Sequence, residues 1–528
     1  MAPRLTRRSF LALSITSAGV TLAYKSLRPA LAQLTTQSLL GIQAGDVTAT
    51  SATIWARGDR QSRMVVDFST SPTFEWSVQT QRGPQVSAET DFTGTVELSE
   101  LRPDTTYYYR ARFVNGSMEP LSGTLQGLIG RFRTAPSIGH ARSIRFVWAA
   151  DMAGQGWGRN PNLKITAFDG EVIQGGYVIF DVMRKLQPDF AVFSGDMIYA
   201  DNPIPPTKPI PEIVGGGTWV NEPALDFVAI SLDEFRANWK YNLGDSKFQR
   251  FLAETPIYVQ WDDHEVTNNW YPTEILTAEP YNGIPASVLT QRAKQAFFEY
   301  NPIRGDQIFR NYNYGRHLEL FLLDERSFRG PNDKNTEPSL DMLGKDQLQW
   351  IKQSLKASQA TWKVISSDDP LSIVTGGPGD YDAWSQNDRR VLGREAELRG
   401  LLKFIKDEGI ENVVWITADV HFPAAISYDP SRAVFQDFNS FWEFVIGPIH
   451  AGAYGPADNL PLDPSFGPKY EFNIFPEEAN LPPPHNQFFG SMEVDGWTAQ
   501  LTVRIHNITG EVVYEKVLNP SDSRWKRN

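Results

Sequence analysis

Cysteine is absent from this chain of 528 residues. Its absence excludes a disulfide framework, a thiolate metal ligand and a cysteine nucleophile. Positive charge is also in short supply, because 50 Lys and Arg residues face 62 Asp and Glu residues and leave a net charge of −12. Such an acidic body repels nucleic acid and anionic lipid at long range, so we expect no nucleic-acid partner.

Long apolar runs are scarce, and the N-terminal one is short. The stretch from Leu11 to Tyr24 is interrupted by Ser, Thr and Gly and is too short for an ordinary membrane-spanning helix. It follows the twin-arginine pattern Thr6-Arg7-Arg8-Ser9-Phe10-Leu11 and precedes an A-x-A cleavage site at Ala30-Leu31-Ala32. We therefore predict that residues 1–32 form a twin-arginine signal peptide, with a short membrane anchor as the alternative.

Export by this route would make the twin-arginine translocation machinery a partner of the chain. The mature protein would start near Gln33, would be periplasmic or secreted, and would have no stable membrane span. Because residues 1–32 carry five basic residues and no acidic ones, their removal changes the net charge from −12 to −17.

Hydrophobic residues, in contrast, are plentiful enough to fill large cores. They make up 41% of the chain, against 21% charged residues, and the aromatic share of 12% includes 15 Trp. These proportions are ordinary for globular proteins and exclude a disordered chain. The length favours two domains.

The first domain is predicted from residues 41–134, where short alternating segments are separated by turn residues. Thr48–Ala56, Met64–Ser69 and Gly94–Leu98 have the pattern of β-strands. Leu101 to Ala111 is a turn that leads into an aromatic strand, and its Leu, Pro and Tyr spacing resembles the tyrosine corner of fibronectin type III or immunoglobulin-like domains. We expect a β-sandwich, followed by a linker over residues 136–141.

From Ile144 onward, predicted strands alternate with predicted helices, which indicates an α/β core. The predicted strands are 145–150, 190–195, 317–324, 362–366 and 412–417, and the predicted helices are 176–186, 232–242, 286–300, 344–358 and 394–407. Residues 201–225 are rich in Pro and Gly and predict a long surface loop. The C-terminal part adds a strand at 444–446 and a hairpin of strands 497–505 and 512–517.

Three short segments at the ends of apolar strands predict a metal site. They are Ser194-Gly195-Asp196-Met197-Ile198-Tyr199, Trp261-Asp262-Asp263-His264-Glu265 and Thr417-Ala418-Asp419-Val420-His421. In open α/β sheets, ligands bind just beyond the carboxyl ends of the strands, so the three segments can converge. Their oxygen, imidazole and phenol groups suit iron, manganese, calcium or zinc in a two-metal hydrolase.

Each candidate ligand has a purely structural alternative, and the joint pattern of the segments favours the role of metal ligand. Asp196 can bridge two cations, and Tyr199 can bind ferric iron through its phenolate; a turn Asp and a core-edge Tyr are the alternatives. Asp151, at the end of the strand Phe146–Ala150, is a fourth candidate ligand or else a turn cap. Asp419 and His421 project to the same side of an extended segment and can both reach one cluster.

The segment around His264 leaves one ligand open. Asp263 or Asn269 can bind a cation, and spacing alone does not choose between them. His264 can face the bound phosphate or the leaving group as the catalytic residue. Arg326, in the strand-end segment Leu322-Leu323-Asp324-Glu325-Arg326, can bind substrate or can form a structural salt bridge.

These motifs, in this order, resemble the alkaline phosphatase D (PhoD-type) branch of the calcineurin-like metallophosphoesterases. The resemblance rests on the twin-arginine signal, the fibronectin-like domain, GDMIYAD, WDDHEVTNNW, LLDERSFRG, MLGKDQLQWI and ITADVH. It implies an N-terminal β-sandwich domain over residues 33–136. It also implies an α/β (α+β) metallophosphatase catalytic domain with a C-terminal extension over residues 137–528.

The resemblance also implies the chemistry: a secreted hydrolase of small phosphate esters with a metal-activated hydroxide. Asp196 would bridge, Tyr199 and His421 would bind ferric iron (Fe3+), and Asp419 with Asp263 or Asn269 would bind a second ion, expected to be calcium. Some PhoD-type enzymes have a cysteine ligand where this chain has Asp151. The purple acid phosphatases, which share the GDxxY unit, have an Asp there, so manganese or zinc is also compatible.

Two other functions are compatible with parts of the sequence. A phospholipase D-like phosphodiesterase acting on lipid head groups would be favoured by an aromatic rim that includes Trp219, Trp270, Tyr271 and Phe441. A non-catalytic binding module built on the β-sandwich would require lost metal ligands, and here the ligands look intact.

Overall fold

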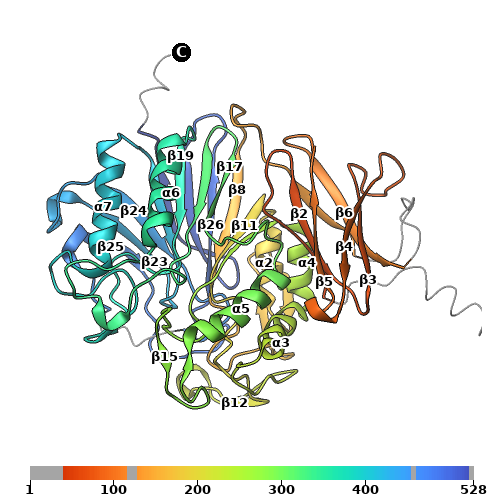
Figure 1. Cartoon of the computed structure of the whole chain (residues 1–528), viewed down its shortest axis with the longest axis horizontal. Helices are drawn as coiled ribbons and strands as arrows, with labels where there is room; N and C mark the ends of the chain where they lie inside the picture. The colour runs from red at the N-terminus through yellow and green to blue at the C-terminus, as the bar shows by residue number, and fades with distance from the viewer. Residues whose placement is uncertain (1–39, 116–127, 454–459, 522–528) are drawn as a thin grey trace, which may run out of the picture.

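The computed structural model describes residues 40–115, 128–453 and 460–521 (Figure 1). The expected signal peptide, residues 1–32, lies outside the described residues. Within the part of the chain that is described, no helix combines the length and the apolar character that a bilayer crossing needs.

The N-terminal region is a β-sandwich, on the right in Figure 1. Its two sheets enclose a core that includes Ile54, Val66 and Tyr109. As the tyrosine corner predicts, the Tyr107 hydroxyl accepts a hydrogen bond of 3.0 Å from the backbone N–H of Arg102. One sheet has the strand order β4 (Gln79–Val86), β3 (Ser62–Ser69), β6 (Thr106–Val114), β7 (Gly130–Arg133), and the other contains β1 (Ile42–Gly45), β2 (Ala52–Arg57) and β5 (Thr93–Leu98).

This sandwich is joined to the rest of the molecule through a shared sheet. β1 pairs in parallel with β14 (Ile257–Gln260) at Gly45 and Ile257, and Asp46 donates its N–H to the Ile257 carbonyl at 3.3 Å. A side chain at Gly45 would lie 2.7 Å from the Pro302 carbonyl oxygen, so the junction requires glycine. The predicted domain boundary therefore separates two folds within one continuous nine-stranded sheet.

The rest of the molecule, from β8 (Ile144–Ala149) onward, contains two sheets that face each other. The first runs β28 (Val512–Leu518), β27 (Leu501–Asn507), β26 (Phe488–Val494), β8 (Ile144–Ala149), β11 (Phe190–Ser194), β14, and continues into β1, β2 and β5. The second runs β17 (Arg310–Tyr314), β18 (Leu318–Leu322), β19 (Trp362–Ser366), β22 (Val413–Thr417), β24 (Phe441–Val445), β23 (Ala424–Tyr428), β25 (Pro468–Asn473).

Strand alternation divides the apolar side chains among three cores. On β11, Phe190 and Val192 point into the core between the sheets, while Ala191 and Phe193 point to the outer core of the first sheet. On β22, Ile416 faces the other sheet and Trp415 faces the outer helices. The continuous apolar runs of these strands follow from burial on both faces.

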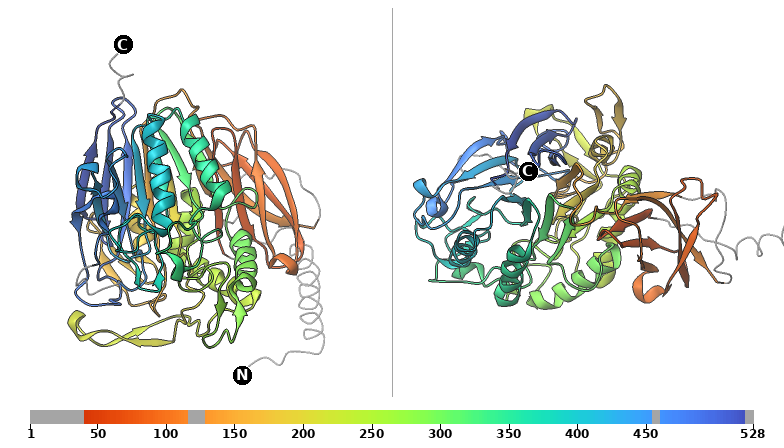
Figure 2. Two further views of the ribbon diagram at one scale, coloured as in Figure 1. Left: turned by 60° about the vertical axis from the view of Figure 1, so that its left-hand side comes forward. Right: turned by 90° about the horizontal axis from the view of Figure 1, so that it is seen from above.

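Helices cover the outer faces of these two sheets, so this part of the molecule has four layers (Figures 1 and 2). The first sheet is covered by α2 (Val178–Lys185), α3 (Leu232–Leu243), α4 (Ser246–Glu254) and α5 (Ala286–Tyr300). The second is covered by α6 (Gly344–Ala357) and α7 (Gly393–Asp407). β8, β11 and β14 are mutually parallel, as are β18, β19, β22 and β24, so their carboxyl ends meet at one edge in each sheet.

Small hairpins and 3₁₀ helices complete the fold. The predicted surface loop 201–225 contains the hairpin of β12 (Thr207–Pro209) and β13 (Thr218–Val220), at the bottom of Figure 1. The other hairpins are β9 (Lys164–Thr166) with β10 (Val172–Gln174), β15 (Ile275–Leu276) with β16 (Ile284–Pro285), and β20 (Gly376–Gly377) with β21 (Asp380–Tyr381). The 3₁₀ helices are Ala88–Thr90, Glu212–Val214, Asn332–Lys334, Pro430–Arg432 and Pro464–Phe466.

Candidate metal centre

The three sequence segments converge at the carboxyl ends of the parallel strands. Asp151 follows β8, Asp196 follows β11, Asp263 follows β14, and Asp419 follows β22. A cavity of about 340 Å³ opens there. Of the residues expected at the site, it is lined by Asp196, Asp263, His264, Asn269, Asp419 and His421.

Two groups of possible ligands share Asp196. In the first, one ligand atom from each of Asp151, Asp196 and His421 lies within 4.8 Å of the others. In the second, the same holds for Asp196, Asp263 and His264. A carboxylate common to two groups is in the position that a bridge between two cations requires.

The backbone at these strand ends turns sharply. Asp151, Asp196, Asn269, Asp419 and His421 have φ angles of +63°, +54°, +54°, +67° and +55°. Non-glycine residues adopt this left-handed region rarely, at a cost of roughly 1–3 kcal/mol each, and such residues cluster at functional sites. The surrounding contacts must therefore hold the turns in place.

Glu265 supplies part of that support and was not singled out by the sequence reasoning. Its carboxylate accepts N–H groups of Asp196 at 3.0 Å, Asp262 at 2.8 Å and Met197 at 2.8 Å. It thereby fastens the turn after β11 to the turn after β14. Gly195 permits the close approach, because a Cβ there would lie 2.4 Å from that of Asp262.

His421 is prepared to act as a neutral ligand. Its Nδ1 lies 2.6 Å from the Gly452 carbonyl oxygen, which can only accept, so Nδ1 carries the proton. The lone pair of Nε2 then faces the Tyr199 hydroxyl at 2.7 Å and Asp151 at 3.6 Å. Burial lowers the pKa of His421 to about 4, which keeps the ring neutral.

Tyr199 is held deep in the site. Its ring lies against Gly154, where a Cβ would approach to 2.6 Å, and it stacks on His264 with ring centres 4.3 Å apart. Burial, and then the carboxylates of Asp196 and Asp151, raise the pKa of the phenol well above its usual value. Only a strong nearby positive charge would favour the phenolate here.

His264 is oriented by a residue that the sequence reasoning missed, Asp201. His264 Nδ1 lies 2.6 Å from Asp201 Oδ1, and the other Asp201 oxygen accepts the Asn268 N–H at 2.8 Å. Burial would lower the pKa of His264, but the carboxylates of Asp201 and Asp263 outweigh it and raise that pKa to about 10. His264 is therefore a cation at neutral pH, with Nε2 at the cavity.

Asp263 and Asn269, the two alternatives for one ligand, lie side by side. The Asn269 N–H donates to Asp263 Oδ2 at 2.6 Å, and both residues line the cavity. Asp263 Oδ1 is buried and has no hydrogen-bond partner among the described residues. The arrangement allows both to bind, and the choice stays open.

The residues present fit a pair of hard cations. Asp151 is fully buried, and both of its carboxylate oxygens lack a hydrogen-bond partner in the described structure. Burial, and then neighbouring carboxylates, raise the pKa values of Asp151, Asp196 and Asp419 well above their usual range. Multivalent cations with a preference for oxygen and imidazole would relieve this unpaired charge.

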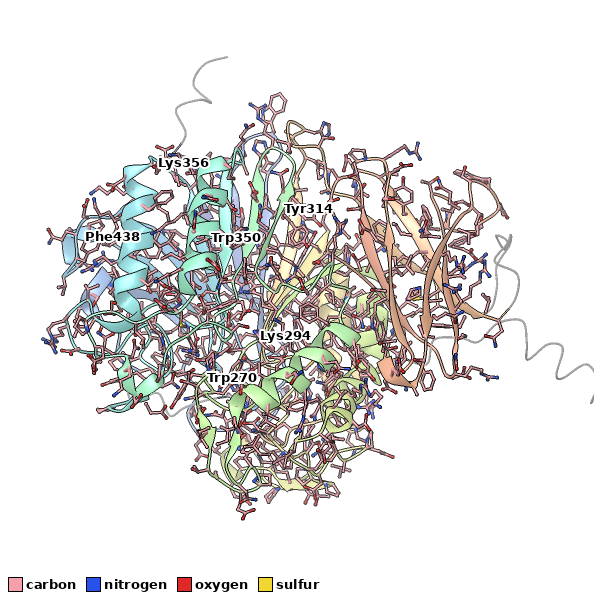
Figure 3. The ribbon with its side chains drawn as sticks, viewed as in Figure 1. Trp270, Lys294, Tyr314, Trp350, Lys356 and Phe438 are labelled. Carbon is pink, nitrogen blue, oxygen red and sulfur yellow. The ribbon has the colours of Figure 1, made fainter. Side chains whose placement is uncertain are left out.

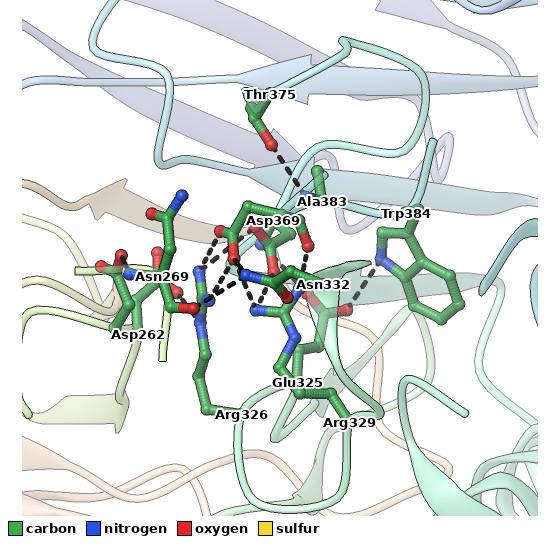
Figure 4. Close-up of polar contacts among 12 residues, drawn as sticks. Asp262, Asn269, Glu325, Arg326, Arg329, Asn332, Asp369, Thr375, Ala383 and Trp384 are labelled. Atoms are coloured by element: carbon green, nitrogen blue, oxygen red, sulfur yellow. Dashed lines mark hydrogen bonds and ion pairs between the residues drawn. The ribbon is translucent and has the colours of Figure 1, made fainter. Parts of the chain in front are cut away.

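Arg326 lies in a different position from the one that substrate binding requires. Its side chain has no exposed surface, and its guanidinium donates to Asp262 at 2.6 Å, to both oxygens of Asp382 at 2.9 Å and to Asp369 at 3.3 Å. Figure 4 shows its guanidinium between Asp262 and Asp369. The predicted substrate contact is therefore corrected to the alternative, a structural salt bridge.

Two further arginines extend this network toward the cavity. Arg329 lies 3.4 Å from Asp369, and Arg394 donates to Asn332 Oδ1 at 2.7 Å (Figure 4 shows Arg329 and Asn332). Asn332 in turn donates to the Asn269 carbonyl at 2.8 Å. The network thus supports the turn that carries Asn269.

Three of the four side chains expected to form an aromatic rim are buried, and the fourth, Tyr271, is half-buried. Trp219, Trp270 and Phe441 are only 2%, 0% and 7% exposed. Trp270, labelled in Figure 3, packs edge-on against Trp261 in the interior. Phe441 lines a separate cavity beside α7. The three buried side chains cannot meet a lipid surface.

Comparison with known proteins supports the same fold. Residues 146–505 match the family described as PhoD-like phosphatase, and residues 25–136 match the N-terminal domain of PhoD-like phosphatases. Alkaline phosphatase D of Bacillus subtilis (strain 168) is 24% identical over 417 residues, which are 72% of this chain and 64% of that protein. The chain thus spans slightly less than two thirds of the length of this curated relative.

Two solved structures extend the likeness over most of the chain. A structure of PhoD matches with a TM-score of 0.66 and 20% identity over 92% of this chain and 89% of its own. A purple acid phosphatase from yellow lupin (Lupinus luteus) seeds matches with a TM-score of 0.56 and 13% identity over 93% and 75%. They confirm the predicted α/β metallophosphoesterase core with an N-terminal β-sandwich, and the family match over residues 146–505 shows that the chain belongs to the PhoD-like phosphatases.

Proposed function

We propose that the chain is a metal-dependent hydrolase of small phosphate esters, with a dinuclear centre at the cavity. The observation that carries this proposal is the position of Asp196, which lies within ligand distance of Asp151 and His421 on one side and of Asp263 on the other. Family membership and the name of the relative, an alkaline phosphatase, support the choice of phosphate esters.

Two sets of residues would hold the cations. Asp151, Tyr199 and His421, together with Asp196, would hold ferric iron, because phenolate and carboxylate are hard, anionic ligands. Asp263 or Asn269 and Asp419, together with Asp196, would hold calcium, with manganese or zinc as alternatives. When bound, such cations draw charge from phosphoryl oxygens and promote the ionisation of water.

The protein's own contribution to turnover would come from His264. Asp201 fixes the ring through Nδ1, so Nε2 is the atom that can donate a hydrogen bond or a proton to the leaving oxygen. The positive charge of the ring would also stabilise the charge that develops on that oxygen. His264 is thus the catalytic residue of the proposal.

The function is tested by metal removal and replacement. The purified protein is chelated, then reloaded with iron and calcium, and assayed on phenyl phosphate and bis(4-nitrophenyl) phosphate. Activity should vanish on chelation and return when the metals are reloaded. The variant His264→Ala should lose activity by a factor of about 10²–10⁴ while it retains metal. The matched control is His140→Ala, since His140 is 60% exposed in its side chain and does not line the cavity. Hydrolysis by the metal-free protein would contradict the proposal.

Iron binding has a spectroscopic test of its own. If Tyr199 binds ferric iron, the loaded protein should absorb visible light through a phenolate-to-iron transition, and Tyr199→Phe should abolish that band. A band that persists in Tyr199→Phe would remove this ligand from the proposal.

Export through the twin-arginine route is proposed from the sequence of residues 1–32 alone. Changing Arg7 and Arg8 to Lys keeps the charge but should leave precursor in the cytoplasm, because the receptor recognises the pair itself. Normal export of this double variant would reject the twin-arginine assignment.

A further inference from the structure

The mouth of the cavity is uncharged. The lining residues that are exposed or half-buried and lie outside the proposed ligand set are Gln155, Asn202, Asn268, Thr375, Gly376 and Leu460. They offer amide, hydroxyl, backbone and apolar groups. A substrate's leaving group, which extends outward from the cations, would meet these neutral groups.

The floor of the cavity is acidic, and His264 is the one cationic side chain among the described residues that line it. Asp196, Asp263, Asp382 and Asp419 line it, and none of the described lining residues is Lys or Arg. The carboxylates that hold cations are matched by those cations. In the proposed function the His264 charge faces the leaving oxygen, so no other cationic side chain of the described lining is left to pair with a second anionic group on a substrate.

Two basic side chains that contact lining residues, Arg326 and Lys208, have partners within the protein. Arg326 is enclosed by Asp262, Asp369 and Asp382. Lys208, on the hairpin beside the mouth, donates to the Gln155 carbonyl and lies 4.1 Å from the centre of the Trp157 ring. The side chains of Arg326 and Lys208 thus contact other groups of the protein and have structural roles.

From this neutral mouth we infer that the centre selects phosphate esters of uncharged alcohols and discriminates against esters whose alcohol carries a carboxylate or a second phosphate. The inference rests on the proposed function and names its substrate class. An additional anion would lose part of its hydration at the mouth without gaining a counter-charge there.

The test compares two esters that differ in charge but not in shape. 4-Carbamoylphenyl phosphate and 4-carboxyphenyl phosphate are assayed with the metal-loaded protein. We expect kcat/KM to be on the order of tenfold higher for the neutral ester at low salt, and the ratio to shrink in 1 M salt, because partly exposed charges are screened. Calorimetric binding of the two matching phosphonates, which are not hydrolysed, should show the same preference.

Charge variants at the mouth of the cavity test whether its neutral residues cause the preference for the neutral ester. Asn268→Lys and Gln155→Lys each introduce a cation beside the leaving group and should reduce the ratio several-fold, whereas Asn268→Gln should not. Gln353→Lys adds the same charge on the exposed side of α6, away from the cavity, and should leave the ratio unchanged.

The outcomes separate this inference from the proposed function. Equal kcat/KM values and equal phosphonate affinities for the charged and neutral compounds would overturn the charge selection, although phosphate-ester hydrolysis would stand. A ratio that Asn268→Lys and Gln155→Lys leave unchanged would likewise overturn the role of the mouth. Absence of hydrolysis of both esters would instead reject the proposed function, and the phosphonate binding would still report on the mouth.

Discussion

Two groups of buried carboxylates lie next to each other in this protein and are compensated in opposite ways. In one, Asp369 and Asp382 surround the guanidinium of Arg326. In the other, Asp151 has two buried oxygens without a hydrogen-bond partner in the described structure, and Asp263 has one. The first group finds its positive charge within the chain, whereas the second requires it from outside.

The pKa values of Asp382 and Asp151 show the same difference, although burial still raises the pKa of Asp369 to about 7. Burial would raise the pKa of Asp382, but Arg326 and Arg329 outweigh it and lower that pKa below its usual value. Burial raises the pKa of Asp151, and neighbouring carboxylates add to that effect. Geometry alone does not separate the groups, because Asp369, Asp382 and Asp419 also lie close enough to hold a cation. What separates the two groups is the presence or absence of a guanidinium beside the carboxylates.

The sharpest test of the second group is Asp196→Asn. An amide is a poor bridge between two cations, so we expect loss of bound metal and a fall in activity of at least about 10⁴-fold, or about 5.5 kcal/mol. Removing one buried charge should not unfold the protein. The measurements are elemental analysis, turnover and thermal unfolding. An Asp196→Asn protein with full metal content and activity would refute the shared site.

The corresponding test of the first group is Arg326→Met. The substitution leaves Asp262, Asp369 and Asp382 buried without their counter-charge, so we expect a loss of stability of about 3–5 kcal/mol. Arg326→Lys should recover only part of it, since an ammonium cannot reproduce the forked contacts. Denaturant unfolding measures both. If Arg326→Met were as stable as the wild type but weakened substrate binding, the original prediction of a substrate contact would be restored.

Sequence alone pointed to most of the residues that converge at the cavity, because they follow strands that are apolar on both faces. Asp196, Asp263 and Asp419 could be recognised as acids at strand ends, and the parallel sheet brings such ends together. The role of Arg326 could not be recognised in the same way. It also follows a strand, and only the fold reveals which carboxylates surround it.

Asp201 and Glu265 were missed for a related reason. Asp201 lies in a loop, away from any strand end, and its importance depends on the approach of His264, 63 residues later. Glu265 could be grouped with its neighbours Asp263 and His264, yet it bonds backbone N–H groups and points away from the cavity lining. Such roles depend on tertiary contacts that spacing does not encode.

The helices and strands likewise divide into those that the sequence predicts and those that it does not. The bounds of α5 and β19 agree with the predicted 286–300 and 362–366, because strong periodicity and flanking turn residues define them. α4 (Ser246–Glu254) was not predicted, although Asp245 caps it by accepting the Lys247 and Phe248 N–H groups. β26 was also missed, since a strand that inserts between β8 and β27 is specified by distant partners.

A smaller effect is expected for Asp201→Asn, which distinguishes an oriented His264 from one that merely lines the cavity. The variant keeps the shape but removes the carboxylate that raises the His264 pKa. We expect activity to fall about 10–100-fold and the alkaline limb of the pH–rate profile to move to lower pH, with metal content unchanged. A lower rate with an unmoved alkaline limb would reduce Asp201 to a purely structural residue.

The smallest effect concerns the stability of the metal-free protein as a function of pH. Burial raises the pKa of Glu265 from 4.5 to about 7, and it raises that of Asp369 from 3.8 to about 7 even though Arg326 and Arg329 oppose it. Between about pH 4 and pH 7 the folded protein therefore holds protons that the unfolded chain has released. The free energy of unfolding must then decrease as the pH rises through this window.

Bound cations should flatten that dependence, because their positive charge favours the ionised carboxylates around Asp196 and lowers the pKa of the neighbouring acids. Thermal unfolding of chelated and metal-loaded protein between pH 5 and pH 8 makes the comparison. We expect the midpoint of the chelated protein to fall by several degrees and that of the loaded protein to change little. Parallel curves would mean that the carboxylates beside the cavity are compensated within the chain, as those around Arg326 are, and the contrast between the two groups would be lost.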